Sequence, residues 1–228
     1  MRAGLSIVIP TLEAGGALPA CLGSLVEGLR AGLIREVIVS DGGSTDATRP
    51  IADAAGAALV SGAPSRGGQL RRGAAAASGA WLLFLHADTV LPAGWAGIVR
   101  ARMDEGGAAA FRLGFDAEGL APWLVAGWAN LRTRLLGLPY GDQALLVSRA
   151  AHDAAGGYPD IPLMEDVALA RALRRRGGRI ALLPLRVTTS AARYRRAGWL
   201  RRGGRNMVCL AQYFAGADPE RIAARYRR

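Results

Sequence analysis

Residues 37–55, VIVSDGGSTDATRPIADAA, contain the transition that decides the fold. The β-branched run predicts a buried strand that ends at Asp41, and Gly42-Gly43 predicts a tight turn behind it. The Ser and Thr that follow are suited to cap a helix predicted over Thr45–Ala55. A strand that passes through a short glycine turn into a helix is the repeating unit of a parallel α/β sheet.

The same alternation runs through the first 90 residues. The predicted strands are Leu5–Ile9, Glu36–Ser40, Ala57–Ser61 and Trp81–His86, and the predicted helices are Leu18–Arg30, Thr45–Ala55 and Gly68–Ala77. Strands separated by helices of this length imply right-handed crossovers. We therefore expect an α/β fold with a mostly parallel central sheet and helices on both faces.

Beyond residue 105 the pattern is less regular. The predicted strands are Ala108–Phe115, Ala144–Ser148, Ile180–Leu183 and Val187–Thr189, and the predicted helices are Leu120–Leu136, Glu165–Arg176 and 199–214. A chain of 228 residues without a linker-like stretch suits one domain.

Charge is distributed unevenly along the chain. All 29 basic residues are Arg, and residues 171–228 hold 16 of them against two acids. Such a basic tail suits anionic lipid, nucleic acid or a phosphorylated substrate, and a solvated helical surface is the alternative. Without Lys a Walker A loop is impossible, and no G-x-G-x-x-G follows the first strand.

The sequence also bears on the compartment. No apolar run approaches the roughly 18 residues of a membrane span. The run at Leu5–Ile9 is too short for a signal peptide. Cys21 and Cys209 lie far apart without metal-ligand spacing, so we expect a reducing, cytoplasmic compartment.

Two carboxylates follow predicted strands. The carboxyl ends of parallel strands share one edge of the sheet, so Asp41 and Asp88 are expected in one crevice, where ligands bind. Asp41 is placed to accept from a ribose or base, and helix capping is the alternative. Thr11 and Glu13, behind the first strand, are further candidates, although an edge-loop turn explains them equally well.

The segment LHADT is a candidate metal site. If the strand Trp81–His86 continues to Asp88, His86 and Asp88 share a face. Asp88, water and phosphate oxygens would complete an octahedral Mg²⁺ or Mn²⁺ site, with His86 as a ligand or an orienting neighbour. A capped strand end beside a core histidine is the alternative.

Glu165 and Asp166 open a predicted helix. Adjacent helical residues point about 100° apart, so one carboxylate can face the crevice as a general base. Acids that complement the helix dipole are the alternative.

Three further segments are candidates for the same crevice. Arg66 lies in a Gly-flanked loop where its guanidinium can meet phosphate. Gly141-Asp142-Gln143 precedes a strand, and Arg193-Tyr194 is expected in a loop that clamps a pyrophosphate. Plain surface positions are the alternative for all of them.

Six motifs in order resemble the inverting family 2 glycosyltransferases with the GT-A fold. They are SIVIPTLEAGG, VIVSDGGSTDAT, SRGGQLRRGAAAASG, WLLFLHADT, YGDQALLVSR and MEDVALARALRR, and they extend over about residues 5–190. The residues of these motifs are similar to those of a compact bacterial branch of the family, some members of which are associated with arsenosugar biosynthesis. The first acid of the usual D-x-D motif is His86 here, while the final acid, which the resemblance implies as the direct metal ligand, is kept as Asp88.

The resemblance implies a nucleoside-diphosphate sugar as donor, with UDP favoured over GDP, and Mn²⁺ or Mg²⁺ as cofactor. It implies Asp166 as catalytic base with Glu165 beside it, and metal binding at Asp88 with His86. Since the sequence lacks the aromatic-interleaved platform or recognition helix of nucleic-acid binders, no nucleic acid partner is expected. The donor-binding residues are then Pro10, Thr11, Glu13, Asp41, Gly43, Arg66, Ala87, Asp88, Arg193 and Tyr194, and the acceptor-pocket residues are Gly141, Asp142 and Gln143.

On this interpretation residues 1–105 bind the nucleotide, residues 106–190 bind the acceptor and catalyse, and residues 191–228 form a basic helical tail. The acceptor is a small molecule or a lipid-linked hydroxyl. The apolar and Arg-rich stretches Leu120–Leu136 and 199–214 suit a peripheral membrane contact, and core packing is the alternative. A nucleotidyltransferase and a non-catalytic nucleotide-binding module are the rival functions.

Overall fold

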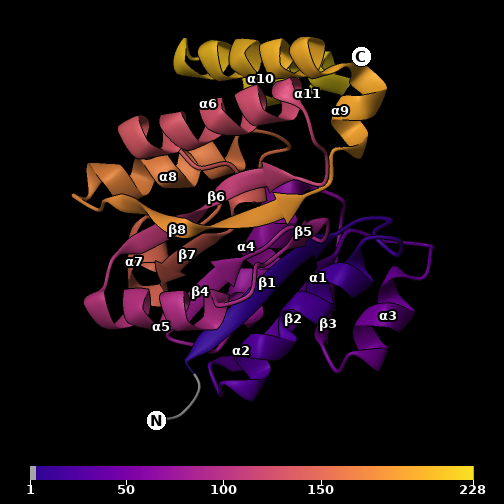
Figure 1. The fold of residues 1–228 in the computed structure, drawn as a ribbon, viewed down its shortest axis with the longest axis vertical. Coiled ribbons are helices and arrows are strands. Elements are labelled where there is room, and N and C mark those ends of the chain that lie inside the picture. The colour runs from indigo at the N-terminus through magenta and orange to yellow at the C-terminus, as the bar shows by residue number, and fades with distance from the viewer. Residues whose placement is uncertain (1–3, 228) are drawn as a thin grey trace.

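A single eight-stranded sheet forms the centre of the computed structural model, which describes residues 4–227 (Figure 1). Its strand order is β3-β2-β1-β4-β7-β6-β8-β5. The strands are β1 (Leu5–Thr11), β2 (Ile34–Asp41), β3 (Ala58–Ser61), β4 (Trp81–Phe84), β5 (Thr89–Val90), β6 (Ala108–Phe115), β7 (Leu145–Ser148) and β8 (Ile180–Thr189). β7 is antiparallel to both β4 and β6, and β5 is antiparallel to β8, whereas the other pairings are parallel. The predicted mostly parallel sheet is confirmed.

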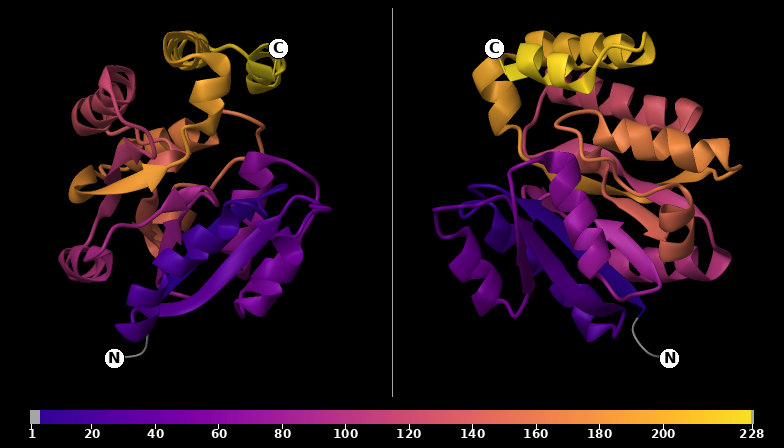
Figure 2. Two further views of the ribbon diagram at one scale, coloured as in Figure 1. Left: turned by 45° about the vertical axis from the view of Figure 1, so that its right-hand side comes forward. Right: turned by 180° about the vertical axis from the view of Figure 1, so that it is seen from behind.

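Helices cover both faces of this sheet (Figure 2). They are α1 (Leu18–Ser24), α2 (Val26–Arg30), α3 (Thr48–Ala54), α4 (Arg66–Ala76), α5 (Trp95–Glu105), α6 (Leu120–Leu136), α7 (Arg149–Ala154), α8 (Glu165–Arg175), α9 (Ala192–Ala197), α10 (Trp199–Phe214) and α11 (Pro219–Arg227), with a 3-10 turn η1 (Gly141–Gln143). Strand β1 shows why both faces are needed. Ile7 and Ile9 point into one core and Val8 into the other, so the strand is a continuous apolar run.

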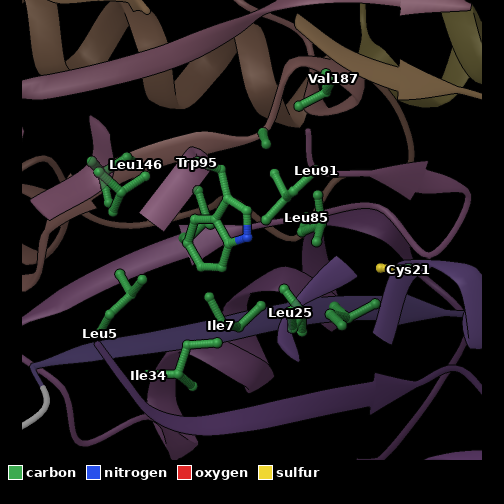
Figure 3. Packing of buried hydrophobic residues seen from close by; sticks show 14 of the residues in the cluster. Leu5, Ile7, Cys21, Leu25, Ile34, Leu85, Leu91, Trp95, Leu146 and Val187 are labelled. Atoms are coloured by element: carbon green, nitrogen blue, oxygen red, sulfur yellow. The ribbon is translucent and has the colours of Figure 1, made fainter. Parts of the chain in front are cut away.

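The core on the first face is organised around Trp95, the first residue of α5, which is fully buried in one cluster with Leu25, Leu91 and Leu146 (Figure 3). Its indole Nε1 donates a hydrogen bond of 3.0 Å to the carbonyl of Ser24. A Cβ on Gly28 would lie 2.5 Å from the indole ring, so only glycine allows α2 to approach it. The core on the other face joins α4 and α8 to the C-terminal helices α10 and α11, through residues such as Leu70, Val167 and Ile222.

The prediction that the strand Trp81–His86 continues to Asp88 is wrong. β4 ends at Phe84, and the chain then turns, with the Thr89 amide donating to the His86 carbonyl at 3.0 Å. The turn lets Thr89–Val90 pair with the distant strand β8, and this partner is invisible to a local pattern. His86 and Asp88 are therefore related by a turn and not by the pleat of a strand.

Three other boundaries differ from the predictions. The helix predicted over Leu18–Arg30 is two helices, because the Leu25 amide bonds to the Leu22 carbonyl and tightens the turn. The two predicted strands of residues 180–189 form the single strand β8, in which a register shift against β6 accommodates Pro184. Arg193-Tyr194, predicted in a loop, lies in α9.

Candidate active site

One pocket gathers side chains from the turn behind β4, the N-terminal ends of α4 and α8, the end of β8 and the C-terminal helices. Nine of the predicted site residues line it: Arg66, His86, Asp88, Gly141, Asp142, Glu165, Asp166, Arg193 and Tyr194. They come from positions 66 to 194 of the chain, and the topology of the sheet brings them together.

Asp166 is held at the start of α8 with one oxygen bound and one available. Its Oδ2 accepts the Gly141 amide at 2.8 Å, whereas its Oδ1 is buried and, within the described residues, has no hydrogen-bond partner. Burial, and then the neighbouring Glu165 carboxylate, raise the pKa of Asp166 to about 7. A carboxylate with this pKa can take a proton near neutral pH.

Glu165 is 1% exposed and faces Arg66, with 3.6 Å between its Oε1 and the Arg66 Nε. Burial raises the pKa of Glu165, and the Arg66 guanidinium opposes this shift. Met164, just before the pair, has a φ of 69°, which L side chains adopt rarely. Backbone strain of this kind persists where the surrounding structure imposes it, and it is frequent at functional sites.

His86 and Asp88 both reach the pocket from the turn. Asp88 Oδ1 lies 3.5 Å from the Thr189 hydroxyl at the end of β8. The buried His86 Nε2 lacks a hydrogen-bond partner among residues 4–227. Burial, and then Arg66, lower the pKa of His86 to about 4, so its imidazole is neutral at pH 7. A Cβ at Gly141 would lie 2.2 Å from the His86 Nε2, so this turn requires glycine.

The turn offers few ligands of its own to a divalent cation. Within residues 4–227, no group of three or more His, Cys, Asp or Glu side chains is arranged to hold a metal. Asp88 and the unpartnered imidazole of His86 supply one carboxylate and one neutral nitrogen. That set fits Mg²⁺ or Mn²⁺ where phosphate and water provide the other ligands, which is how these ions are usually held beside phosphates.

Of the three predicted acceptor residues in the turn η1, two line the pocket and one does not. Burial raises the pKa of Asp142 to about 6, and its buried Oδ1 has no partner within the part of the chain described. Gln143 points away from the pocket: it is fully buried, donates to the Phe111 carbonyl at 3.1 Å and accepts from the Thr133 hydroxyl at 2.8 Å. Gln143 therefore anchors the turn, while Gly141 and Asp142 face the pocket.

The other predicted donor residues do not line this pocket: Pro10, Thr11, Glu13, Asp41, Gly43 and Ala87. Asp41 is fully buried in the loops behind β1 and β2. Its carboxylate accepts from the amides of Gly43 and Ser44 and from the hydroxyls of Ser44 and Thr11 at 2.5–3.1 Å. Burial alone would raise its pKa, but these hydrogen bonds, those from Ser44 first, outweigh it and hold the pKa of Asp41 below its ordinary value.

The same hydrogen-bond network joins the two loops. Glu13 has a φ of 51° and its Oε1 accepts the Thr45 amide at 2.8 Å. Asp46 accepts the Gly15 amide at 2.8 Å. The loops at the ends of β1 and β2 thus form one preorganised surface, and a role for these residues in donor binding stays a prediction.

Three lining residues come from the C-terminal helices and were missed by sequence reasoning: Arg202, Asn206 and Tyr226. Arg202 donates to the Tyr226 hydroxyl at 2.6 Å, and Asn206 donates to the Tyr194 hydroxyl at 3.1 Å. No local motif marks them, because their place depends on how α10 and α11 fold back onto the sheet.

The family model of the glycosyl transferase family 2 matches residues 6–140 of the chain. The PGL/p-HBAD biosynthesis glycosyltransferases of Mycobacterium bovis (strain BCG / Pasteur) and Mycobacterium tuberculosis (strain H37Ra) are 40% identical over 93 residues. The match covers 38% of this chain and 36% of each relative, so it spans little more than a third of their length.

Solved structures are similar over a greater length. The glucosyl-3-phosphoglycerate synthase of Mycobacterium tuberculosis, in complex with Mn²⁺ and UDP-glucose, superposes with a TM-score of 0.66 at 24% identity, covering 94% of this chain and 79% of that one. Staphylococcus aureus TarS 1-349 gives a TM-score of 0.64 at 17% identity, covering 97% and 70%. At this identity the likeness shows the fold, and the expected GT-A fold is confirmed.

Proposed function

Because the chain belongs to the glycosyl transferase family 2, we propose that it transfers a sugar from a nucleoside-diphosphate sugar to an acceptor hydroxyl. The observation that carries this proposal is the pocket in which Asp166 lies among Asp88, Arg66 and Arg193. Asp166 has a pKa of about 7, and one of its oxygens has no hydrogen-bond partner among residues 4–227. A proton acceptor beside positive groups is the arrangement that such a displacement needs.

The donor is a UDP-sugar in this proposal, with GDP as the alternative base. The similar mycobacterial synthase is complexed with UDP-glucose and Mn²⁺, which supports both the donor class and the metal. Asp88 and His86 would hold Mn²⁺ or Mg²⁺, which when bound neutralises charge on the diphosphate. Arg66 and Arg193 add positive charge at the same wall of the pocket.

The reaction proposed for Asp166 is removal of the proton from the acceptor hydroxyl by its free Oδ1. The hydroxyl oxygen then bonds to the anomeric carbon as the bond to the diphosphate breaks, and this single displacement inverts the anomeric configuration. Glu165 keeps Arg66 in place and raises the pKa of Asp166. In this proposal residues 1–105 bind the nucleotide, and residues 106–190 bind the acceptor and supply the catalytic base. Residues 191–228 form the outer wall of the pocket.

The acceptor in this proposal is a hydroxyl of a small molecule or of a lipid-linked compound. The pocket supports a polar acceptor, since Asp142, Asn206 and Tyr226 line it beside Asp166.

The test combines nucleotide binding and turnover. UDP at about 100 times its Kd should add about 2.7 kcal/mol of stability, which shifts the melting temperature by roughly 5–10 °C. We expect this shift with Mn²⁺, not with EDTA, and a much smaller one in Asp88→Ala. In Asp166→Asn the shift should persist, while release of UDP from UDP-sugar and acceptor falls about 10²–10⁴-fold.

If no nucleoside diphosphate shifts the melting temperature with either metal, the proposed donor site is refuted. Normal turnover in Asp166→Asn would refute the base assignment alone.

A further inference from the structure

Exposed apolar side chains are concentrated on two helices of this protein. Within residues 4–227, eleven of the fourteen exposed large hydrophobic residues lie on α6 or α10. On α6, five of them share one side of the helix, because their spacing follows its turns. They are Leu120, Leu124, Trp128, Leu131 and Leu135.

Helix α10 contributes further exposed apolar side chains. Its exposed Leu200, Met207, Val208 and Phe214 also follow the helical period. The two helices pack against each other (Figures 1 and 2), and a Cβ on Gly203 of α10 would lie 3.8 Å from the Val125 Cγ2 of α6. We call the exposed apolar side chains of the two helices the α6–α10 face. Exposed apolar side chains gathered in a patch mark interaction sites on soluble proteins.

On the three helices nearest this face the charge has one sign, and the acids beside them are Glu118, exposed just before α6, and Asp116, which pairs with Arg195 of α9 at 3.8 Å. Helices α6, α9 and α10 contain eight Arg and no Asp or Glu. Arg134 and Arg201 are exposed on α6 and α10 themselves, and Arg196 is exposed on α9. Apolar and aromatic side chains bordered by Arg are the composition of helices that lie in the headgroup layer of an anionic bilayer.

A second copy of this chain is the rival occupant. Pairing two α6–α10 faces would bring the arginines of both copies together, and none of the three helices offers a carboxylate to neutralise them. Like charges brought together in this way cost several kcal/mol at an interface. An anionic bilayer is complementary to both kinds of side chain, because its acyl layer accepts the apolar residues and its headgroups neutralise the arginines.

We propose that the α6–α10 face docks the protein on the surface of an anionic phospholipid bilayer. Among the described residues, none of the helices has the length and apolar composition required to traverse a bilayer. The proposed docking places Trp123 and Trp128 of α6 at the level of the headgroups.

Helix α10 connects this face to the pocket. Arg202 and Asn206 line the pocket from one side of α10, while Leu200 and Val208 are exposed on another. Bilayer docking would thus fix the helix that forms the outer wall of the pocket. This coupling rests on the proposed function, whereas the docking itself does not.

Tryptophan emission gives a direct test, without nucleotide, metal or acceptor. Adding vesicles of phosphatidylcholine with phosphatidylglycerol at low salt should shift the emission to shorter wavelength. Pure phosphatidylcholine should shift it much less. In the double variant Trp123→Phe/Trp128→Phe most of the shift should disappear while co-sedimentation with the vesicles persists, because Trp81, Trp95 and Trp199 are less exposed.

Charge reversal supplies the matched comparison. Arg134→Glu/Arg201→Glu should weaken vesicle binding by about tenfold or more, since each Arg near the surface contributes about fivefold. Arg30→Glu/Arg49→Glu makes the same change of net charge on α2 and α3 and should alter binding by less than about twofold. Likewise Trp128→Glu/Val208→Glu should abolish binding, and Leu29→Glu on α2 should not. Melting temperatures verify that each variant is folded.

Absence of wild-type binding to anionic vesicles at low salt would overturn the proposal, as would equal losses in the two charge-reversal pairs. A dimer in light scattering that Trp128→Glu dissociates, with no vesicle binding, would show that a second copy covers the face. Failure of the UDP and Mn²⁺ shift would refute the transfer reaction and leave the vesicle result standing.

Discussion

At the scale of the single residue, the proposed catalytic side chain of Asp166 destabilises the folded protein. Burial raises its pKa from 3.8 to about 7. A carboxyl whose pKa is higher in the folded state than in the unfolded state destabilises the fold once the pH exceeds its unfolded-state pKa. The full cost is reached when the pH exceeds its folded-state pKa. Asp166→Asn should therefore melt roughly 10 °C higher than wild type at pH 8, and at nearly the same temperature at pH 4.

Thermal unfolding followed by circular dichroism measures this difference. Asp104→Asn, an exposed acid on α5, is the control and should leave the melting temperature unchanged at both pH values. A lower melting temperature for Asp166→Asn at pH 8 would mean that the hydrogen bond from Gly141 outweighs the cost of burial.

Gly141 sets the distance between the two walls of the pocket. A Cβ at this position would lie 2.2 Å from the His86 Nε2 and 3.0 Å from the Asp166 Oδ2, so one of the two must move. We expect Gly141→Ala to lower kcat/KM by about 10²-fold, the cost of displacing a reacting group by about 1 Å. Steady-state kinetics on the variant measures it.

Gly97→Ala is the matched control, because nothing lies within 4 Å of its added Cβ on α5. It should keep full activity and gain about 0.5–1 kcal/mol in stability. Full activity in Gly141→Ala would show that the turn opens without displacing His86 or Asp166.

At the scale of elements, the buried strands and helices were predictable and the turns between them were not. The run Val37–Val39 is apolar because both faces of β2 are covered, and a single sequence displays that directly. The turn at His86–Asp88 depends on pairing of Thr89 with Thr189, one hundred residues away, so the local pattern suggested a longer strand. Gln143 failed as a pocket residue for the same reason, since Thr133 and Phe111 hold it from other elements.

The loops behind β1 and β2 form a further testable element. Four hydrogen bonds within these loops end on the Asp41 carboxylate, which is fully buried. Asp41→Ala leaves the donors of Thr11, Gly43 and Ser44 without an acceptor, at a cost of about 1–3 kcal/mol in the free energy of unfolding. Urea denaturation measures the loss.

Because the folded-state pKa of Asp41 is lowered, its contribution is present above the unfolded pKa and disappears as pH falls through the folded value. The gap between wild type and Asp41→Ala should therefore narrow in acid. Asp53→Ala, an exposed acid on α3, should cost little at any pH, and a comparable loss there would assign the effect to net charge.

At the scale of the whole molecule, the order of the motifs and the sheet topology act together. The family match ends at residue 140, yet Glu165 and Asp166, beyond it, face Arg66 and His86 within it. Motif order was sufficient to predict this juxtaposition. It gave no information on Arg202, Asn206 and Tyr226, because the positions of α10 and α11 are fixed by packing onto the rest of the fold rather than by a local motif.

The charge asymmetry of the molecule leads to a last prediction. The tail of residues 171–228, with its 16 Arg, encloses one side of a pocket proposed for an anionic donor. Its field should favour encounter with a diphosphate at low ionic strength and be screened at high ionic strength. The donor kcat/KM should fall about threefold or more between about 20 and 300 mM salt, while kcat stays constant.

Arg196→Glu on α9 should lower the donor kcat/KM in low salt only, whereas Arg49→Glu on α3 should leave it unchanged. If both variants lost the same amount, the net charge of the protein and not the placement of its tail would govern the encounter.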